Sequence, residues 1–163
     1  AQAWTFTDNV AIGGTVTASN GGSLTGTWTD LGTVTTVDIN GGTIGGVTLT
    51  NPTITDFVES VVAVGTVTTT HTFVLTSGTM QTATLTASTA CTFTMPTATA
   101  GKSFTVLLKQ AASTGNGTAT FTGVKWIAAG APTITATAGK MDILSFTADG
   151  TNWYGSYTQE YTP

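Results

Sequence analysis

Few residues in this chain have side chains suited to acid–base or nucleophilic chemistry. His71 is the only histidine and Cys91 the only cysteine. A catalytic nucleophile needs a nearby base, usually a histidine, to take its proton. In the alternating stretch TVTTTHTFVLT, His71 shares a face with Thr69 and Phe73. This pattern favours a structural histidine over a catalytic one. Three copies of His71 around an axis would be able to bind a metal, but no other residue supports such a site.

The single cysteine also indicates a structural role. Cys91 alternates with Phe93 and Met95 in the stretch CTFTMP, which predicts a buried core thiol. One cysteine excludes an internal disulfide, and a zinc site within one chain would lack ligands. We therefore expect no metal and no cofactor.

Paired carboxylates are the remaining route to catalysis, since two acids are enough to cleave a polysaccharide. The aspartates that come into question are Asp30, Asp38, Asp56, Asp142 and Asp149. Asp149 precedes a glycine in a turn signal, and the three N-terminal aspartates lie beside expected strand ends, where turn hydrogen bonding explains them. The sequence predicts a protein that is not an enzyme.

The composition indicates which elements must carry these residues. Threonine makes up about a quarter of the 163 residues, and charged residues only 7%, against about 25% in average domains. Threonine is β-branched and favours strands, while its hydroxyl keeps an exposed face hydrated. Hydrophobic residues are 40% of the chain, enough to fill a core. The prediction is an all-β protein.

The charge balance argues against two classes of partner. The chain has four lysines, no arginine and a net charge of −4, so it lacks the basic surface that nucleic acid requires. No apolar run approaches the 18 or so residues needed to span a bilayer, and we expect no membrane insertion. The start, AQAWTFTDNV, does not resemble a secretory signal.

Glycine and strand patterns divide the chain into three predicted regions. Residues 1–12 form an N-terminal arm, residues 13–65 a Gly/Thr-rich stem, and residues 66–163 a head. In the head, short alternating segments with turn signals predict an antiparallel β-sandwich of the jelly-roll kind. Asp149-Gly150 predicts the turn of a terminal hairpin. The one helix candidate, residues 54–64, is equally compatible with a strand. The strands expected before that hairpin are 81–88, 91–96, 101–110, 115–123, 124–130 and 132–139.

The stem has regularly spaced apolar residues but too many glycines to fill a core alone. Three identical chains wound about one axis would bring these residues together in a narrow shared core, and we expect a homotrimer. A flexible Gly/Thr linker is the alternative. The candidate trimer-core residues are Ile39, Ile44, Val47, Leu49 and Ile54.

An aromatic group near the C-terminus suits sugar binding, because aromatic faces beside amide and charged groups recognise sugar rings. Trp153 is expected in the core, whereas for Trp126 and Tyr154 a core position and a binding position remain open. The candidate ligand-contact residues are Lys125, Trp126, Asn152 and Tyr154.

Two stretches resemble a known group of proteins. LGTVTTVDINGGTIGGVTLTNPTIT is similar to the Gly-Thr-Ile stretches of tail-fibre and other virion appendage proteins of tailed bacteriophages. CTFTMPTATAGKSFTVLLKQ, together with GVKWIAAGAPTITATAGKMDILSFTADGTNWYGS, resembles a C-terminal β domain of phage fibres. Together the quoted stretches make up about half of the chain. The resemblance implies a homotrimeric protein at the virion surface, built from an interwoven stem and a β-sandwich head.

The resemblance implies two possible placements on the virion. The first is a surface fibre that contacts host-surface polysaccharide. The second is a capsid decoration or head-fibre protein that stabilises the capsid without binding a receptor. The arm, with Trp4, Phe6 and Val10 on one strand face, would attach to a capsid or tail protein, and in the second case it would do so by adding a strand to a capsid sheet. Long fibres normally begin with a larger anchor domain, so an anchor has been removed or the protein is small. A secreted adhesin or lectin domain is a more distant alternative.

Overall fold

The computed structural model describes residue 48 and residues 50–163. By its contacts the chain divides into two units, residues 1–51 and residues 52–163, and the second unit contains every strand described below. The arm residues Trp4, Phe6 and Val10 lie outside the described residues, as do Ile39, Ile44, Val47 and Leu49 of the predicted trimer core.

The second unit is built from strands, and no helix occurs among the described residues. The all-β prediction is therefore confirmed. The helix candidate at 54–64 contains no helix, because residues 52–60 are exposed and a strand begins at Val61. The described residues also contain no helix long and apolar enough to cross a membrane. The strands are β1 (Val61–Val67), β2 (Thr70–Thr72), β3 (Met80–Leu85), β4 (Ala90–Thr94), β5 (Ser103–Lys109), β6 (Thr118–Thr122), β7 (Val124–Lys125), β8 (Met141–Ala148) and β9 (Trp153–Tyr161).

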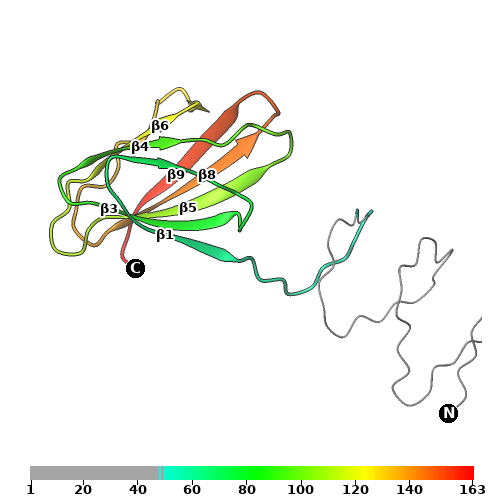
Figure 1. Ribbon diagram of the computed structural model, residues 1–163, viewed down its shortest axis with the longest axis horizontal. Coiled ribbons are helices and arrows are strands. Elements are labelled where there is room, and N and C mark those ends of the chain that lie inside the picture. The colour runs from blue at the N-terminus through cyan, green and yellow to red at the C-terminus, as the bar shows by residue number, and fades with distance from the viewer. Residues whose placement is uncertain (1–47, 49) are drawn as a thin grey trace, which may run out of the picture. The chain divides into compact units, whose positions relative to one another are not determined.

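These strands form two sheets that face each other across one core (Figure 1). The larger has six strands in the order β1-β3-β5-β8-β9-β7, and the smaller has three in the order β2-β4-β6. From β1 to β6 the chain alternates between the two sheets. Each strand lies parallel to the preceding strand of its own sheet. The result is a β-solenoid-like arrangement of three successive coils.

The antiparallel direction expected for the head is therefore wrong for the first six strands. Alternation of apolar and polar residues shows that one face of a strand is buried, but it is the same for parallel and antiparallel pairs. The coils also differ in length. Val61 lies beside Met80, 19 positions later, and Met80 beside Thr105, 25 positions later. A solenoid with coils of unequal length leaves no fixed repeat in the sequence.

The hydrogen-bond ladder continues where the chain passes from one sheet to the other. Thr86 N–H donates to Val67 O at 3.1 Å, and Thr92 N–H to Thr69 O at 2.8 Å. The third coil is joined in the same way, with Thr118 N–H donating to Thr89 O at 3.0 Å. The corners are therefore stacked as regularly as the strands, which satisfies backbone groups that a bend would otherwise leave unpaired.

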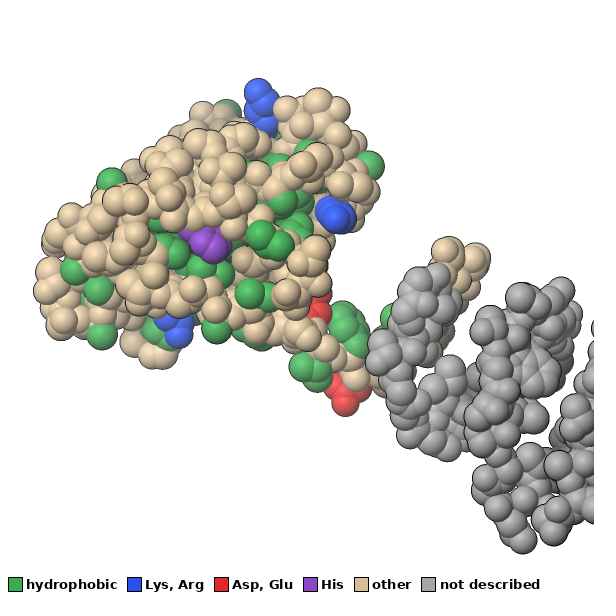
Figure 2. Space-filling view, in the orientation of Figure 1, with side chains coloured by type: hydrophobic (Ala, Val, Ile, Leu, Met, Phe, Trp, Pro, Cys, Tyr) green, Lys and Arg blue, Asp and Glu red, His purple; other side chains and the backbone are tan. Residues whose placement is uncertain are grey.

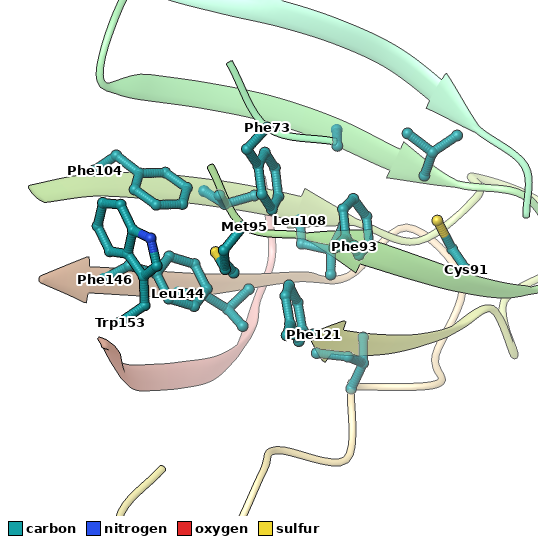
Figure 3. Close-up of a cluster of buried hydrophobic side chains, with 14 of the residues drawn as sticks. Phe73, Cys91, Phe93, Met95, Phe104, Leu108, Phe121, Leu144, Phe146 and Trp153 are labelled. Carbon is teal, nitrogen blue, oxygen red and sulfur yellow. The ribbon is translucent and has the colours of Figure 1, made fainter. Parts of the chain in front are cut away.

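Aromatic residues from both sheets fill the core (Figure 3). Phe73, Phe93 and Phe121 stack face to face, with ring centroids 5.1 and 5.2 Å apart. On the side of the larger sheet, Phe104 stacks on Phe146 at 4.8 Å and meets the edge of Trp153 at 5.1 Å. Each coil contributes one ring to the first stack, which ties the coils together through the core.

The C-terminal part is antiparallel, as expected for a terminal hairpin. β8 pairs antiparallel with both β5 and β9, and Asp149 and Gly150 form the turn between β8 and β9. The segment 132–139, expected as a strand, has no regular structure. Instead, buried side chains hold it by its backbone: Gln110 Nε2 donates to Thr135 O at 2.7 Å, and Thr135 N–H donates to Asp142 Oδ2 at 2.8 Å.

β1 lies partly in the predicted stem. Residues 61–65 were placed there by the sequence analysis, and here they pair with β3 as part of the six-stranded sheet. Among the described strands, β1 and β2 are the outermost at one end of the two sheets, so their free edges within residues 50–163 form the N-terminal end of the solenoid.

Candidate functional site

Two of the four predicted ligand-contact residues lie side by side on the outer surface. β7 runs parallel to β9 at the edge of the larger sheet, with Lys125 beside Tyr154. Both side chains are exposed. Asn152 is half-buried in the adjoining turn, so three of the four residues come from one corner of the domain.

Asp149 organises that corner. Its Oδ1 accepts hydrogen bonds from the N–H groups of Thr151 and Asn152, both at 2.7 Å. Its Oδ2 accepts the hydroxyl of Tyr154 at 2.9 Å. The bonds from Asn152, Thr151 and Tyr154 lower the pKa of Asp149 from 3.8 to about 2. In return, the hydrogen bond to the carboxylate and its negative charge raise the pKa of Tyr154. The Tyr154 hydroxyl is thus already engaged within the turn.

Trp126 does not join this corner, because its ring packs inward. It meets Phe121 edge-on at 5.7 Å, and contacts Phe146 and Tyr157 at 5.9 and 6.0 Å. The ring lies directly over Gly155, where a Cβ atom would come within 2.5 Å of it. Trp126 therefore covers the end of the core. Trp153 is only 2% exposed and donates its indole N–H to Pro96 O at 2.7 Å, as expected for a core residue.

The two residues with reactive side chains have structural surroundings. His71 is half-buried and packs edge-on against Phe73 and Phe93 at 5.3 and 6.0 Å, and burial lowers its pKa. Cys91 is 2% exposed in the core, as predicted, and burial raises its pKa. A raised pKa disfavours the thiolate, which is the reactive form.

The two head aspartates lie at opposite ends of β8. Asp142 is near its start and Asp149 just past its end, a separation of about 20 Å at 3.3 Å per residue. Paired glycosidase acids lie within about 10 Å of each other. Asp142 is buried and accepts N–H groups from Thr135 and Glu160 and the side-chain amide of Gln159. Asp142 thus joins the irregular segment at Thr135 to the end of β9.

Further candidates for chemistry are few. Asp30 and Asp38 lie outside the described residues, and Asp56 is exposed in the segment before β1. Within residues 50–163, no group of three or more His, Cys, Asp or Glu side chains lies close enough to hold a metal ion.

The structure shows a pocket that the sequence analysis missed. It has a volume of about 400 Å³ and lies between two segments, residues 72–76 after β2 and residues 96–102 before β5. Residues 77–95 separate the two segments in the sequence, and the segments meet only because successive coils stack. Threonines are too common in this chain for their position to have indicated a site.

Exposed apolar side chains mark the entry to the folded unit. Ile54 is 61% exposed, Phe57 69%, Val58 92% and Val61 60%. Figure 2 shows hydrophobic and acidic side chains at the surface where the chain enters the folded unit. The acidic residues of this segment are Asp56 and Glu59. Ile54 was predicted to lie in a trimer core, and in the part of the chain that the structure describes it is largely exposed.

Comparison of the chain with protein-family models, with curated proteins and with solved structures finds no match.

Proposed function

We propose that this chain is a non-catalytic structural protein of a tailed-bacteriophage virion. It assembles as a homotrimer and displays residues 52–163 at the virion surface, as a fibre that contacts host-surface glycans. The proposal joins the two sequence resemblances with the properties of the folded unit. That unit is all-β, and its residues with reactive side chains are used in packing and turns.

One observation carries the assembly part of the proposal. Ile54, Phe57, Val58 and Val61 are 60–92% exposed in the single chain. Burying a large apolar side chain stabilises a structure by about 1.5–3 kcal/mol, so a run of four is costly to leave in water. The run lies at the C-terminal end of the predicted stem, residues 13–65, and three copies brought together there would cover one another.

The free edges of β1 and β2 point to the same end. Solenoids need their terminal coils covered, and exposed strand edges pair readily with other chains. At the opposite end, Trp126 covers the core and β7 lies outside β9. The uncovered end of the domain is thus the one where the chain enters, which suits attachment to a stem and outward display of the rest.

The test is to locate the protein on phage particles. Antibodies raised against residues 52–163, labelled with gold, should bind purified virions at fibres, as seen by electron microscopy. Label spread over the capsid, with the gene next to the major capsid gene, would favour the decoration alternative. Particles without label would contradict a virion protein.

A further inference from the structure

The pocket between residues 72–76 and 96–102 has walls that are held in place from behind. Gln81, only 1% exposed, donates its side-chain amide to Val74 O at 2.8 Å. Trp153 donates its indole N–H to Pro96 O at 2.7 Å. Both donors come from the buried face of the larger sheet. The pocket is therefore formed before any ligand arrives, which reduces the entropy lost on binding.

The end of the 96–102 wall is held by the end of β8. Lys102 N–H donates to Thr99 O at 3.1 Å, and Ala148 N–H donates to Lys102 O at 2.8 Å. The backbone of Lys102 is thus fixed while its side chain is exposed. The ammonium group is a point charge on a flexible stem, so from this position it can reach an anion bound in the pocket.

The lining combines three kinds of group. The apolar surface comes from Val74, Leu75 and Pro96, of which Val74 is 56% exposed, whereas Phe73, also at the lining, belongs to the core and is 1% exposed. Four threonines at the lining, at positions 72, 76, 97 and 99, present hydroxyls that both donate and accept hydrogen bonds. Lys102 is the only charged residue among the lining residues.

Each group matches a part of one ligand class. The apolar wall suits the C–H face of a sugar ring, the threonines suit its hydroxyls, and Lys102 suits a carboxylate. The chain as a whole has a net charge of −4, whereas the pocket lining has one lysine and no acidic residue. The lining therefore favours an anionic ligand over a cationic one. A volume of about 400 Å³ lies within the range of small-ligand sites and suits one or two sugar units.

We propose that this pocket binds an acidic saccharide, with Lys102 holding the carboxylate of a uronic acid unit and the threonines holding its ring hydroxyls. The inference rests on the proposed contact with host-surface glycans and gives it a place and a chemical class. It locates the site away from the predicted residues Lys125, Asn152 and Tyr154.

The test is a titration of the full chain with trigalacturonic acid, followed by NMR chemical shifts. Its trimethyl ester is the matched probe, because esterification removes the charge and keeps the rings and hydroxyls. We expect the acid to bind and the ester to bind at least about tenfold more weakly, the loss expected for a charge-assisted hydrogen bond. Equal binding of the two probes, or binding of neither, would overturn the proposal.

Single substitutions test whether the saccharide binds at this pocket. Lys102→Gln should weaken trigalacturonate binding about tenfold, and Thr97→Val should weaken it without changing the charge. Lys125→Gln, at an exposed lysine beside Tyr154, is the matched control and should leave binding unchanged. All three substituted side chains are exposed, so the urea unfolding of each variant should match that of the wild type. Loss of binding in Lys125→Gln with retention in Lys102→Gln would assign the site to the other corner.

The solution mass of the same samples separates this proposal from the proposed function. A trimer that binds neither probe overturns only the pocket assignment. A monomer that binds the acid overturns the assembly and leaves the pocket.

Discussion

The Asp149 turn shows how much a single residue can organise at the surface of this domain. One carboxylate accepts two backbone N–H groups and a tyrosine hydroxyl. Since these bonds favour the charged form, the pKa falls from 3.8 to about 2. The ionised carboxylate therefore stabilises the folded state above about pH 3.8, and this contribution is lost as the pH falls toward 2.

Asp149→Asn removes the charge and keeps an acceptor for the turn. We expect the pKa of Tyr154 to fall toward its ordinary value, because the carboxylate is the main cause of its rise. We also expect the decline of stability in acid to be shallower in the variant. Carbon NMR of the tyrosine rings during a pH titration measures the first effect and urea unfolding below pH 4 the second. Glu160→Gln, an exposed acid at the far end of β9, is the control. An unchanged Tyr154 pKa in Asp149→Asn would show that the hydrogen bond does not persist in solution.

Gly155→Ala tests the packing of Trp126. The added Cβ would lie 2.5 Å from the indole ring, so the ring must move away from Phe121 and Tyr157. We expect a loss of about 1–3 kcal/mol, as is usual for overpacking, together with a change in tryptophan fluorescence. Ser156→Ala, the exposed neighbour, should change stability by less than about 0.5 kcal/mol. A Gly155→Ala protein as stable as the wild type would contradict the observed cover of Trp126 over the strand.

Alternation along a strand predicted the burial of individual residues well where neighbouring residues in the sequence determine that burial. Cys91 and Trp153 are buried because their strands bury every second residue, and Asp149 is a turn residue because glycine follows it. Trp126 was left open between core and surface because its position depends on Gly155, 29 residues later, whose missing side chain makes room for the ring. Such a pairing leaves no mark in a single sequence.

At the scale of the strands, the stacked rings of Phe73, Phe93 and Phe121 link the three coils. Phe93 is in the middle of the stack, with a partner ring on each side, and is fully buried. The direction of the strands was not predictable, because alternation of apolar and polar residues is the same in parallel and antiparallel pairs. The direction is decided by the connection between successive strands. Between β1 and β2 only Thr68 and Thr69 intervene, and this short corner carries the chain into the opposite sheet instead of back along the same one.

Phe93→Ala should therefore destabilise the whole domain by about 3–5 kcal/mol, the usual cost of removing a buried phenylalanine. Thr92→Ala, on the other face of β4, is the matched control and should cost less than about 1 kcal/mol. Urea unfolding monitored by circular dichroism measures both. A Phe93→Ala loss no larger than that of Thr92→Ala would mean that the stack does not hold the coils together.

At the scale of the whole molecule, the uncovered features gather where the chain enters residues 52–163. The free edges of β1 and β2 and the exposed run from Ile54 to Val61 lie at this end. The sequence indicated spaced apolar residues in this region. Whether another chain covers them is a property of the assembly, and residue patterns in one chain do not determine it.

The double substitution Phe57→Ser and Val58→Ser removes the two most exposed apolar side chains of this run. We expect the domain to stay folded, because neither side chain is in its core, and the trimer to dissociate at protein concentrations where the wild type is assembled. Val74→Ser, at another valine that is 56% exposed, should leave assembly unchanged. Sedimentation velocity of the three proteins makes the comparison. Equal dissociation of the control, or none in the double variant, would place the interface elsewhere.

The most direct measurement is the solution mass of the purified full chain, by light scattering at micromolar concentration and moderate salt. Homotrimeric assembly predicts a mass of three times 16.5 kDa. A mass of 16.5 kDa, unchanged as the protein is concentrated, would contradict it and would mean that the exposed run before β1 is covered by a different partner.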